Sequence, residues 1–279
     1  MKRDELGRAL KVAVRAAQAA GDVLRRELHH AKRISAQQQH DIKLELDVRC
    51  QKKIERVLRS SFPRIPSLGE EGILGNPNAP TRWVVDPIDG TVNFTYGIPH
   101  ACVSIALQAR PPAEQSSRRR DAEEHQTLLG VVYDPFCDEL WTATRGQPAL
   151  LNGRVIHVSG RDQLRETIIS MGFAKQRKTM AATLPIFNRL IRKVRKIRIM
   201  GAAALGLVYV ATGRFDAYIE SGIRLWDIAA GGLILECAGG VFWRMKIPGK
   251  YAYRLVASNG KLRKKLGPYA WSKPAGGSL

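Results

Sequence analysis

The segment WVVDPIDGTVNF, residues 83–94, ends a run of strand-forming residues in two aspartates that flank a Pro-Ile pair. We expect the strand to place Asp86 at its carboxyl end, because Pro87 cannot donate to a sheet ladder and must stop regular pairing. The turn would then bring Asp89 and the Ile88 carbonyl round toward Asp86. Three hard oxygen ligands facing one point suit Mg²⁺, which prefers carboxylate and carbonyl oxygens.

The next two residues, Gly90 and Thr91, would open a short helix. The amide groups and the dipole at a helix N-terminus favour a bound phosphate, so one turn would combine a metal site and a phosphate cradle. A purely structural interpretation is also open: an aspartate before glycine often bonds only its own backbone, and a threonine often only caps a helix.

Two further acids favour the chemical interpretation. Glu70 lies in GEEG, residues 69–72, at the end of a predicted strand, and Asp227 lies at a predicted helix start in LWDIAAGG, residues 225–232. With Asp86 and Asp89 they are enough carboxylates to hold two cations, with Asp86 bridging. A pair of cations activates water and neutralises the charge that develops on a phosphate. The predicted chemistry is phosphate ester hydrolysis.

The segments DPIDGTVNF, GEE and WDIAAGGLILECAGG closely resemble the signature regions of the inositol monophosphatase family. Members of that family are magnesium-dependent, lithium-sensitive phosphatases with a layered αβαβα sandwich, in which two β-sheets are interleaved with helices. The resemblance covers nearly the whole chain. It implies the same fold here, and two or three Mg²⁺ ions in each active site.

The resemblance also implies two sets of metal ligands. Glu70, Asp86 and the Ile88 carbonyl would bind one ion. Asp86, Asp89 and Asp227 would bind the second.

Other matched positions would act on water, phosphate and substrate. Thr91 would work with Glu70 to orient the attacking water, and the amides of Gly90 and Thr91 would hold the phosphate. Glu220, in RFDAYIESG, matches an acid that binds substrate hydroxyls. Asp47 and Glu71 match supporting carboxylates near the metals.

Three positions depart from the family pattern. Leu44 stands where a threonine is usual, and Ala36 where many relatives carry a lysine. Ala202, in GAAA, stands where a serine is usual, at a position that the resemblance assigns to substrate binding. None of these removes a predicted metal ligand. The departures therefore bear on the substrate rather than on the reaction.

The elements that position these residues can be read from apolar spacing. Two amphipathic helices are expected over 1–28 and 41–62, the second closed by Pro63. Short strands follow at IPSLGEE, RWVVD, ACVSIALQA, LLGVVYD and DELWTATR, several of which should pair in one antiparallel sheet. Residues 110–126 read as an exposed loop, and LLNGRV, 150–155, carries an Asn-Gly hairpin signal.

Beyond residue 158 strands and helices alternate, with a helix expected over roughly 180–196. No low-complexity linker separates two independent units. We therefore expect a single domain over 1–279, with a metal-binding half over 1–158 and a substrate-binding half over 159–279.

The composition bounds the remaining possibilities. The 279 residues are 44% hydrophobic, enough for a substantial core, and charges interrupt the apolar runs too often for a membrane span. The four cysteines form no CxxC pair, which favours a reducing, cytoplasmic setting. The histidines show no metal-ligand spacing, so any metal must be held by oxygen.

The formal net charge of +20 attracts polyanions. The cations gather at 116–120, 188–198 and 260–267, without interleaved aromatics that would stack on bases. We expect solvated faces with weak polyanion binding. An RNA-binding or polyanion-binding protein on a phosphatase scaffold is the alternative of another class.

The favoured function is a Mg²⁺-dependent phosphomonoesterase for a small polyol phosphate, foremost myo-inositol 1-phosphate. Proteins with closely related motifs act on fructose 1,6-bisphosphate, histidinol phosphate or adenosine 3′,5′-bisphosphate, and the motif does not choose among these substrates. Family members are commonly dimers, so a homodimer is expected.

Overall fold

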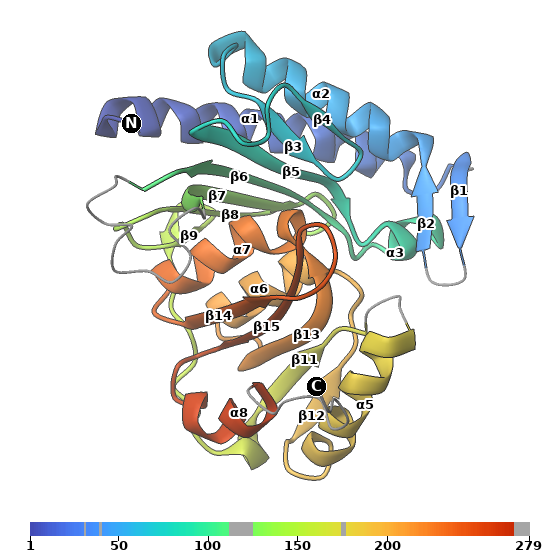
Figure 1. Cartoon of the computed structure of the whole chain (residues 1–279), viewed down its shortest axis with the longest axis vertical. Coiled ribbons are helices and arrows are strands. Elements are labelled where there is room, and N and C mark those ends of the chain that lie inside the picture. The colour runs from blue at the N-terminus through green and yellow to red at the C-terminus, as the bar shows by residue number, and fades with distance from the viewer. Residues whose placement is uncertain (31, 39–40, 112–124, 174–176, 271–279) are drawn as a thin grey trace.

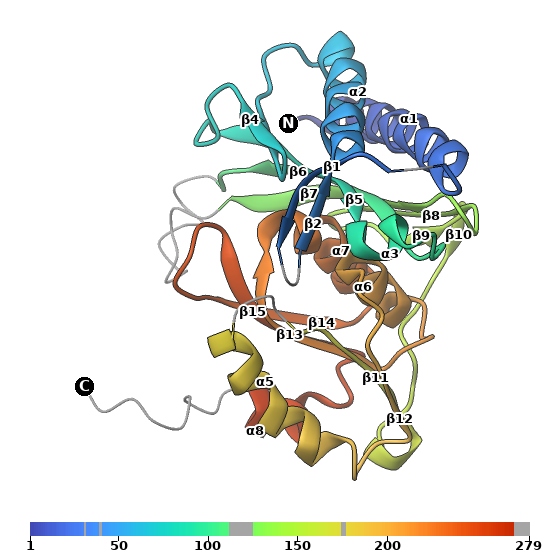
Figure 2. The same cartoon turned by 90° about the vertical axis from the view of Figure 1, so that its right-hand side faces the viewer.

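The computed structural model describes residues 1–30, 32–38, 41–111, 125–173 and 177–270. In these segments the chain forms five layers, helices, sheet, helices, sheet and helices, as Figures 1 and 2 show. The predicted αβαβα sandwich is confirmed. Across the same segments, no helix is both long enough and apolar enough to span a bilayer.

The first layer consists of helices α1 (Arg3–Glu27) and α2 (Glu45–Ser61). Small and branched side chains of α1, among them Ala13 and Ala17, are fully buried against α2 and the sheet below. The helix predicted over 41–62 is wrong in its first turn. Residues 41–44 form strand β2 (Asp41–Leu44), which pairs antiparallel with β1 (Ile34–Gln38). The helix begins only where the Asp47 carboxylate accepts the Leu44 amide at 2.7 Å.

The first sheet has eight strands in the order β10-β9-β8-β7-β6-β5-β3-β4. They are β3 (Ser67–Gly69), β4 (Gly72–Leu74), β5 (Thr81–Asp89), β6 (Cys102–Ala109), β7 (Gln126–Asp134), β8 (Glu139–Thr144), β9 (Leu150–Leu151) and β10 (Arg154–Val155). All neighbours are antiparallel except β3 and β5, so the sheet is mixed rather than purely antiparallel. The hairpin between β9 and β10 is confirmed: Asn152 and Gly153 both have positive φ, as a type I′ turn requires.

The second sheet has five strands in the order β12-β11-β13-β15-β14. They are β11 (Ile168–Met171), β12 (Lys196–Arg198), β13 (Ala217–Arg224), β14 (Val241–Lys246) and β15 (Ala252–Ser258). Helices α5 (Arg177–Leu190) and α8 (Arg263–Ala270) cover its outer face (Figure 2).

The helix predicted over roughly 180–196 is wrong beyond Leu190. Helix α5 ends there, and Lys196 starts the edge strand β12 after a short turn. The amide of Arg195 donates to the Thr167 carbonyl at 3.0 Å, so pairing with a distant segment overrides the local helical pattern. Of the loop expected over 110–126, residues 112–124 lie outside the described segments, including the basic run 116–120.

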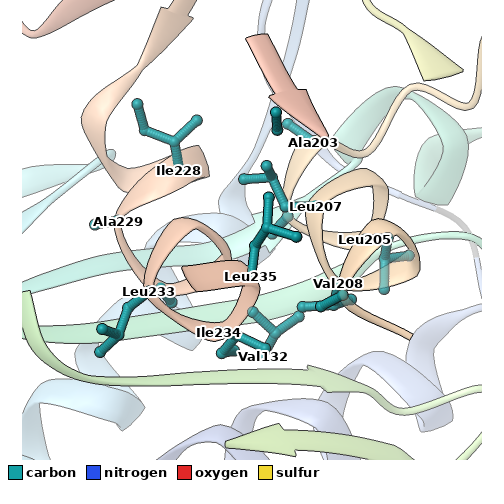
Figure 3. Packing of buried hydrophobic residues seen from close by; sticks show 14 of the residues in the cluster. Val132, Ala203, Leu205, Leu207, Val208, Ile228, Ala229, Leu233, Ile234 and Leu235 are labelled. Atoms are coloured by element: carbon teal, nitrogen blue, oxygen red, sulfur yellow. The ribbon is translucent and has the colours of Figure 1, made fainter. Parts of the chain in front are cut away.

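The middle layer consists of α6 (Ala203–Ala211) and α7 (Leu225–Cys237), which lie between the two sheets. Both helices are apolar on nearly every face, as burial from both sides demands. Figure 3 shows side chains of the two helices interleaved above Val132 of β7. Gly130 of β7 lets α7 approach the first sheet closely, because a Cβ at Gly130 would lie 2.8 Å from the Ala230 carbonyl oxygen.

Candidate metal and phosphate site

The turn after β5 is built by a β-bulge. Asp86 pairs with Ser104 and Asp89 with Cys102, so three steps along β5 oppose two along β6. Inside the bulge, the Ile88 amide donates to Asp86 Oδ1 at 3.0 Å. The interruption at Pro87 predicted from the sequence is therefore present.

Three of the predicted ligands converge. One carboxylate oxygen each from Glu70, Asp86 and Asp227 lies within 4.8 Å of the other two. Glu70 reaches Asp86 because β3 and β5 run parallel, and its amide donates to the Val85 carbonyl at 3.1 Å. The carboxyl ends of these strands therefore open at one edge of the sheet.

Asp227 reaches the same point from the first turn of α7. Its Oδ2 accepts the Arg224 amide at 2.8 Å, which fixes the carboxylate at the helix start. The hydroxyl of Ser104 donates to the Trp226 carbonyl at 3.1 Å and ties the helix start to β6. Asp227 thus has the capping contact that a purely structural role would give it, and it also faces the other two acids.

The electrostatics of the cluster call for a cation. Asp86 is buried, with 1% of its surface exposed. Burial raises the pKa of Asp86 well above its usual value, and the neighbouring carboxylates of Glu70, Asp89 and Asp227 raise it further. A hard divalent cation would relieve this repulsion, and the donor set consists of oxygens. The residues therefore fit the magnesium site that the resemblance implies.

Asp89 lies beside this group with a different set of contacts. Its Oδ1 accepts the Ala203 amide at 3.0 Å and its Oδ2 the Ala204 amide at 2.7 Å, so it caps the N-terminus of α6. The Cys102 thiol lies 3.6 Å from Oδ2. Burial raises the pKa of Asp89 to about 7, although the two amide hydrogen bonds pull it down. Its role as a ligand of the second metal stays a prediction.

Gly90 and Thr91 stand where the phosphate cradle is predicted. Gly90 has φ +96°, and a Cβ there would lie 2.9 Å from the His100 carbonyl oxygen and 3.2 Å from the Ala202 Cβ. Ala202 therefore lies beside this turn, and its role in substrate binding stays a prediction. Thr91 opens α3 (Thr91–Thr95), and its hydroxyl donates to the Ile88 carbonyl at 2.9 Å.

The two predicted supporting acids are tied to helix α2, and their role near the metals stays a prediction. Asp47 is buried and holds the start of α2 through the Leu44 amide. The Glu71 amide donates to Gln51 Oε1 at 2.9 Å, which ties the β3–β4 turn to α2. The Leu44 side chain is 1% exposed, so this departure contributes to the core rather than to the site. Ala36 lies in β1, opposite Lys43.

Glu220 is half-buried in β13, the strand that runs directly into α7. The hydroxyl of Tyr218, which sequence reasoning missed, donates to Glu220 Oε2. The pKa of Tyr218 is raised by burial and then by the charges of Glu220, Asp89 and Asp227. The signal was in the sequence, because residues two apart in a strand share a face.

With this geometry established, comparison with known proteins decides the family. A model of the inositol monophosphatase family matches residues 5–274. The chain belongs to that family. The resemblance drawn from the signature segments is thereby confirmed.

Relatives with two different names match almost equally well. The chain is 37% identical over 265 residues to the Nus factor SuhB of Xylella fastidiosa, and the match covers 91% of each chain. It is 38% identical over 243 residues to an inositol monophosphatase of Mesembryanthemum crystallinum, covering 84% of each. The extragenic suppressor protein suhB of Bartonella henselae has the same fold, with a TM-score of 0.82, 32% identity, and coverage of 95% of this chain and 98% of that one.

Proposed function

We propose that this protein is a Mg²⁺-dependent phosphomonoesterase that hydrolyses a small polyol phosphate, foremost myo-inositol 1-phosphate. The observation that carries the proposal is the convergence of Glu70, Asp86 and Asp227 on one point next to the Gly90-Thr91 turn. Clustered carboxylates repel one another without cations, so such a group is costly to keep as mere structure.

Two sets of oxygens would hold the metals. Glu70, Asp86 and the Ile88 carbonyl would bind the first ion, and Asp86, Asp89 and Asp227 the second. Bound Mg²⁺ would supply Lewis-acid activation of water and would neutralise the phosphate charge.

The chain's own groups would do the rest. Glu70 would accept a proton from the attacking water. Because the Thr91 hydroxyl gives its proton to the Ile88 carbonyl, its oxygen is left as an acceptor that can orient the same water. The first amides of a helix have no acceptor within it, so those of Gly90 and Thr91 would bind phosphate oxygens. Glu220 would accept hydrogen bonds from substrate hydroxyls.

The test is phosphate release from a panel of esters: myo-inositol 1-phosphate, fructose 1,6-bisphosphate, histidinol phosphate and adenosine 3′,5′-bisphosphate. We expect turnover with Mg²⁺, none in excess chelator, and inhibition by Li⁺. Asp227→Asn should abolish release, whereas Asp22→Asn, an exposed aspartate on α1, should leave it unchanged. Hydrolysis at the same rate in chelator, or no hydrolysis of any ester, would refute the proposal.

Polyanion binding is a second candidate function, supported by the net charge and by one exposed segment. Arg192, Lys193, Arg195, Lys196 and Arg198 are all exposed. Across the described part of the chain, no carboxylate forms a salt bridge with any of these five side chains. Arg195, Lys196 and Arg198 line a groove of about 400 Å³, together with apolar residues such as Phe187 and Ile191. Filter binding of single-stranded RNA across a salt series tests this candidate.

The expected setting and assembly are proposals as well. All four cysteines are free thiols, which supports a reducing, cytoplasmic environment. For a homodimer, the support is an exposed apolar surface close to the site. Tyr96, Ile98 and Ile199 are exposed, and the Asn93 side chain joins their segments by donating to the Met200 carbonyl at 2.8 Å. Light scattering at several protein concentrations would measure the assembly state.

A further inference from the structure

Tyr218, which is buried, and Glu220, which is half-buried, form a hydrogen-bonded pair at the predicted substrate side of the site. They lie two residues apart on β13, so both side chains leave the same face of the strand. Tyr218 is 3% exposed, and its ring lies against α6, where a Cβ at Gly206 would be 3.4 Å from it. Its hydroxyl, the only polar atom of the side chain, donates to Glu220 Oε2.

The backbone of Gly172 packs against the carboxylate of Glu220. Gly172 follows β11, and its amide donates to the Ile219 carbonyl at 3.0 Å, which fixes it against β13. A Cβ at Gly172 would lie 1.8 Å from Glu220 Oε2. Only glycine leaves room for the carboxylate here, and the carboxylate is therefore held between a phenol and a backbone.

We propose that Tyr218 is the positioning residue that orients Glu220 toward the hydroxyls of the substrate, with Gly172 providing the space for that orientation. The inference rests on the proposed phosphatase function and deepens it by assigning substrate selection to this pair. An acceptor held in place before substrate arrives loses little conformational freedom on binding, which strengthens each hydrogen bond that it makes.

The direction of the hydrogen bond defines the substrate class. Burial, and after it the carboxylates of Glu220, Asp89 and Asp227, raise the pKa of Tyr218 well above its usual value, so the phenol keeps its proton. Glu220 is therefore the acceptor of this hydrogen bond, and a substrate group that faces its remaining acceptor positions must donate. A hydroxyl near the ester satisfies this requirement, whereas a second phosphate or a carboxylate at that place would be repelled. The pair therefore selects polyol monophosphates over bisphosphates that place an anion there.

The experiment compares two substrates of the Mg²⁺-loaded enzyme, myo-inositol 1-phosphate and p-nitrophenyl phosphate, which has no hydroxyl. Tyr218→Phe should lower kcat/KM for the polyol ester about tenfold, mainly through KM, and should leave p-nitrophenyl phosphate within about twofold. The matched control is Tyr133→Phe. Tyr133 is also 3% exposed and donates to a carboxylate, Asp138, at 2.8 Å. The control variant should leave kcat/KM unchanged for both substrates.

Gly172→Ala gives an independent variant, because it displaces Glu220 and leaves the phenol intact. It should lower the ratio of kcat/KM for myo-inositol 1-phosphate to kcat/KM for p-nitrophenyl phosphate, as Tyr218→Phe does. If thermal melting shows that Tyr218→Phe does not fold, the inference is tested by the kcat/KM ratio of Gly172→Ala alone. Equal losses on both substrates, or no loss on either, would overturn the inference. Failure of the proposed function would look different, since the unmodified enzyme would then hydrolyse neither ester.

Discussion

Asp89 accepts a hydrogen bond of 2.7 Å from the amide of Ala204, 115 residues further along the chain. The residue that the sequence matches to a metal ligand is thus also the cap of a central helix. Helix α6 needs this cap, because the side chain of its N-cap residue, Ala202, makes no capping hydrogen bond. A change at Asp89 should therefore affect both activity and stability.

Asp89→Asn should lose most turnover and also destabilise the protein. Asparagine keeps one carbonyl oxygen, so one of the two capped amides loses its acceptor and the charge that favours a helix N-terminus disappears. In saturating Mg²⁺ we expect the free energy of unfolding to fall by about 1–3 kcal/mol, with the fold retained. Urea denaturation and phosphate release measure the two effects, with Asp22→Asn as control. Unchanged stability would mean that the capping bonds contribute little.

The metal-free protein should lose stability as pH rises from about 4 to about 7. The pKa of Asp89 is raised to about 7 and that of Asp86 is also raised, whereas an unfolded aspartate titrates near about 3.9. Across this window the folded chain binds more protons than the unfolded chain, so the free energy of unfolding decreases with pH. Bound Mg²⁺ replaces those protons and should remove the dependence.

Thermal melting of the chelated protein at pH 5 and pH 8, each repeated with Mg²⁺, measures this effect. The increase in Tm on adding Mg²⁺ should be larger at pH 8. Because other groups also titrate, the comparison is made against Asp89→Asn, whose pH slope should be smaller than that of the unmodified protein. An equal slope in the two proteins would show that Asp89 does not carry the dependence.

The sequence predicts the parts of the site that depend on one segment or on two neighbouring strands. The bulge at Asp86 follows from Pro87, and Glu70 meets Asp86 because parallel strands end at one edge. The contacts of Asp89 with α6 could not be predicted, since they depend on how helices from the second half of the chain pack between the sheets. The pair of Tyr218 and Glu220 could have been found from its spacing, but its burial could not.

The fold shows the same division between local and distant causes. Helix α1 and the hairpin at Asn152 follow from periodicity and turn chemistry. Residues 41–44 and 191–196 were expected in helices, because their apolar spacing is compatible with one. Residues 41–44 instead form a hairpin with the preceding strand β1, and residues 196–198 pair with the distant strand β11.

Ala202→Ser should stabilise the protein. A serine hydroxyl at this N-cap position can accept an amide of the first turn of α6 that Asp89 does not reach, and such caps contribute about 0.5–2 kcal/mol. We expect a gain near the lower end, because Ala202 is 4% exposed and the hydroxyl must fit beside Gly90. Urea denaturation measures the gain, with Ala202→Gly as the comparison without a hydroxyl. A destabilised Ala202→Ser would show that the space at the turn is insufficient.

Neutralising Arg192, Lys193, Arg195 and Lys196 together, each to Gln, should weaken binding of single-stranded RNA and reduce its salt dependence. Each phosphate contact that is lost lowers the slope of log K against log salt by about 0.7 for a single strand. Hydrolysis of a small phosphate ester should not change, because these exposed side chains carry no assigned role at the acidic cluster. A folded variant with collapsed catalysis would place them in the active site.

A control with equal charge separates local from diffuse attraction. Lys2, Arg3, Lys11 and Arg15 are exposed cations at the N-terminus and along α1, and their joint replacement by Gln changes the net charge by the same amount. If both variants weaken RNA binding equally, the attraction comes from the net charge of the protein and not from the segment before β12.

Glu220→Gln should damage kcat/KM for myo-inositol 1-phosphate far more than for p-nitrophenyl phosphate, while the Mg²⁺ concentration for half-maximal activity stays nearly unchanged. A charged acceptor bound to a hydroxyl contributes about 1.5–3 kcal/mol, and p-nitrophenyl phosphate offers no hydroxyl to bind. The alternative is that Glu220 pairs with Arg224, a surface interaction worth about 0–1 kcal/mol. In the structure Arg224 Nη1 donates to the Lys250 carbonyl at 2.8 Å, and the acid receives the Tyr218 hydroxyl. Equal losses on both esters would assign Glu220 to the metal site or the fold, and no loss on either would leave the surface role standing.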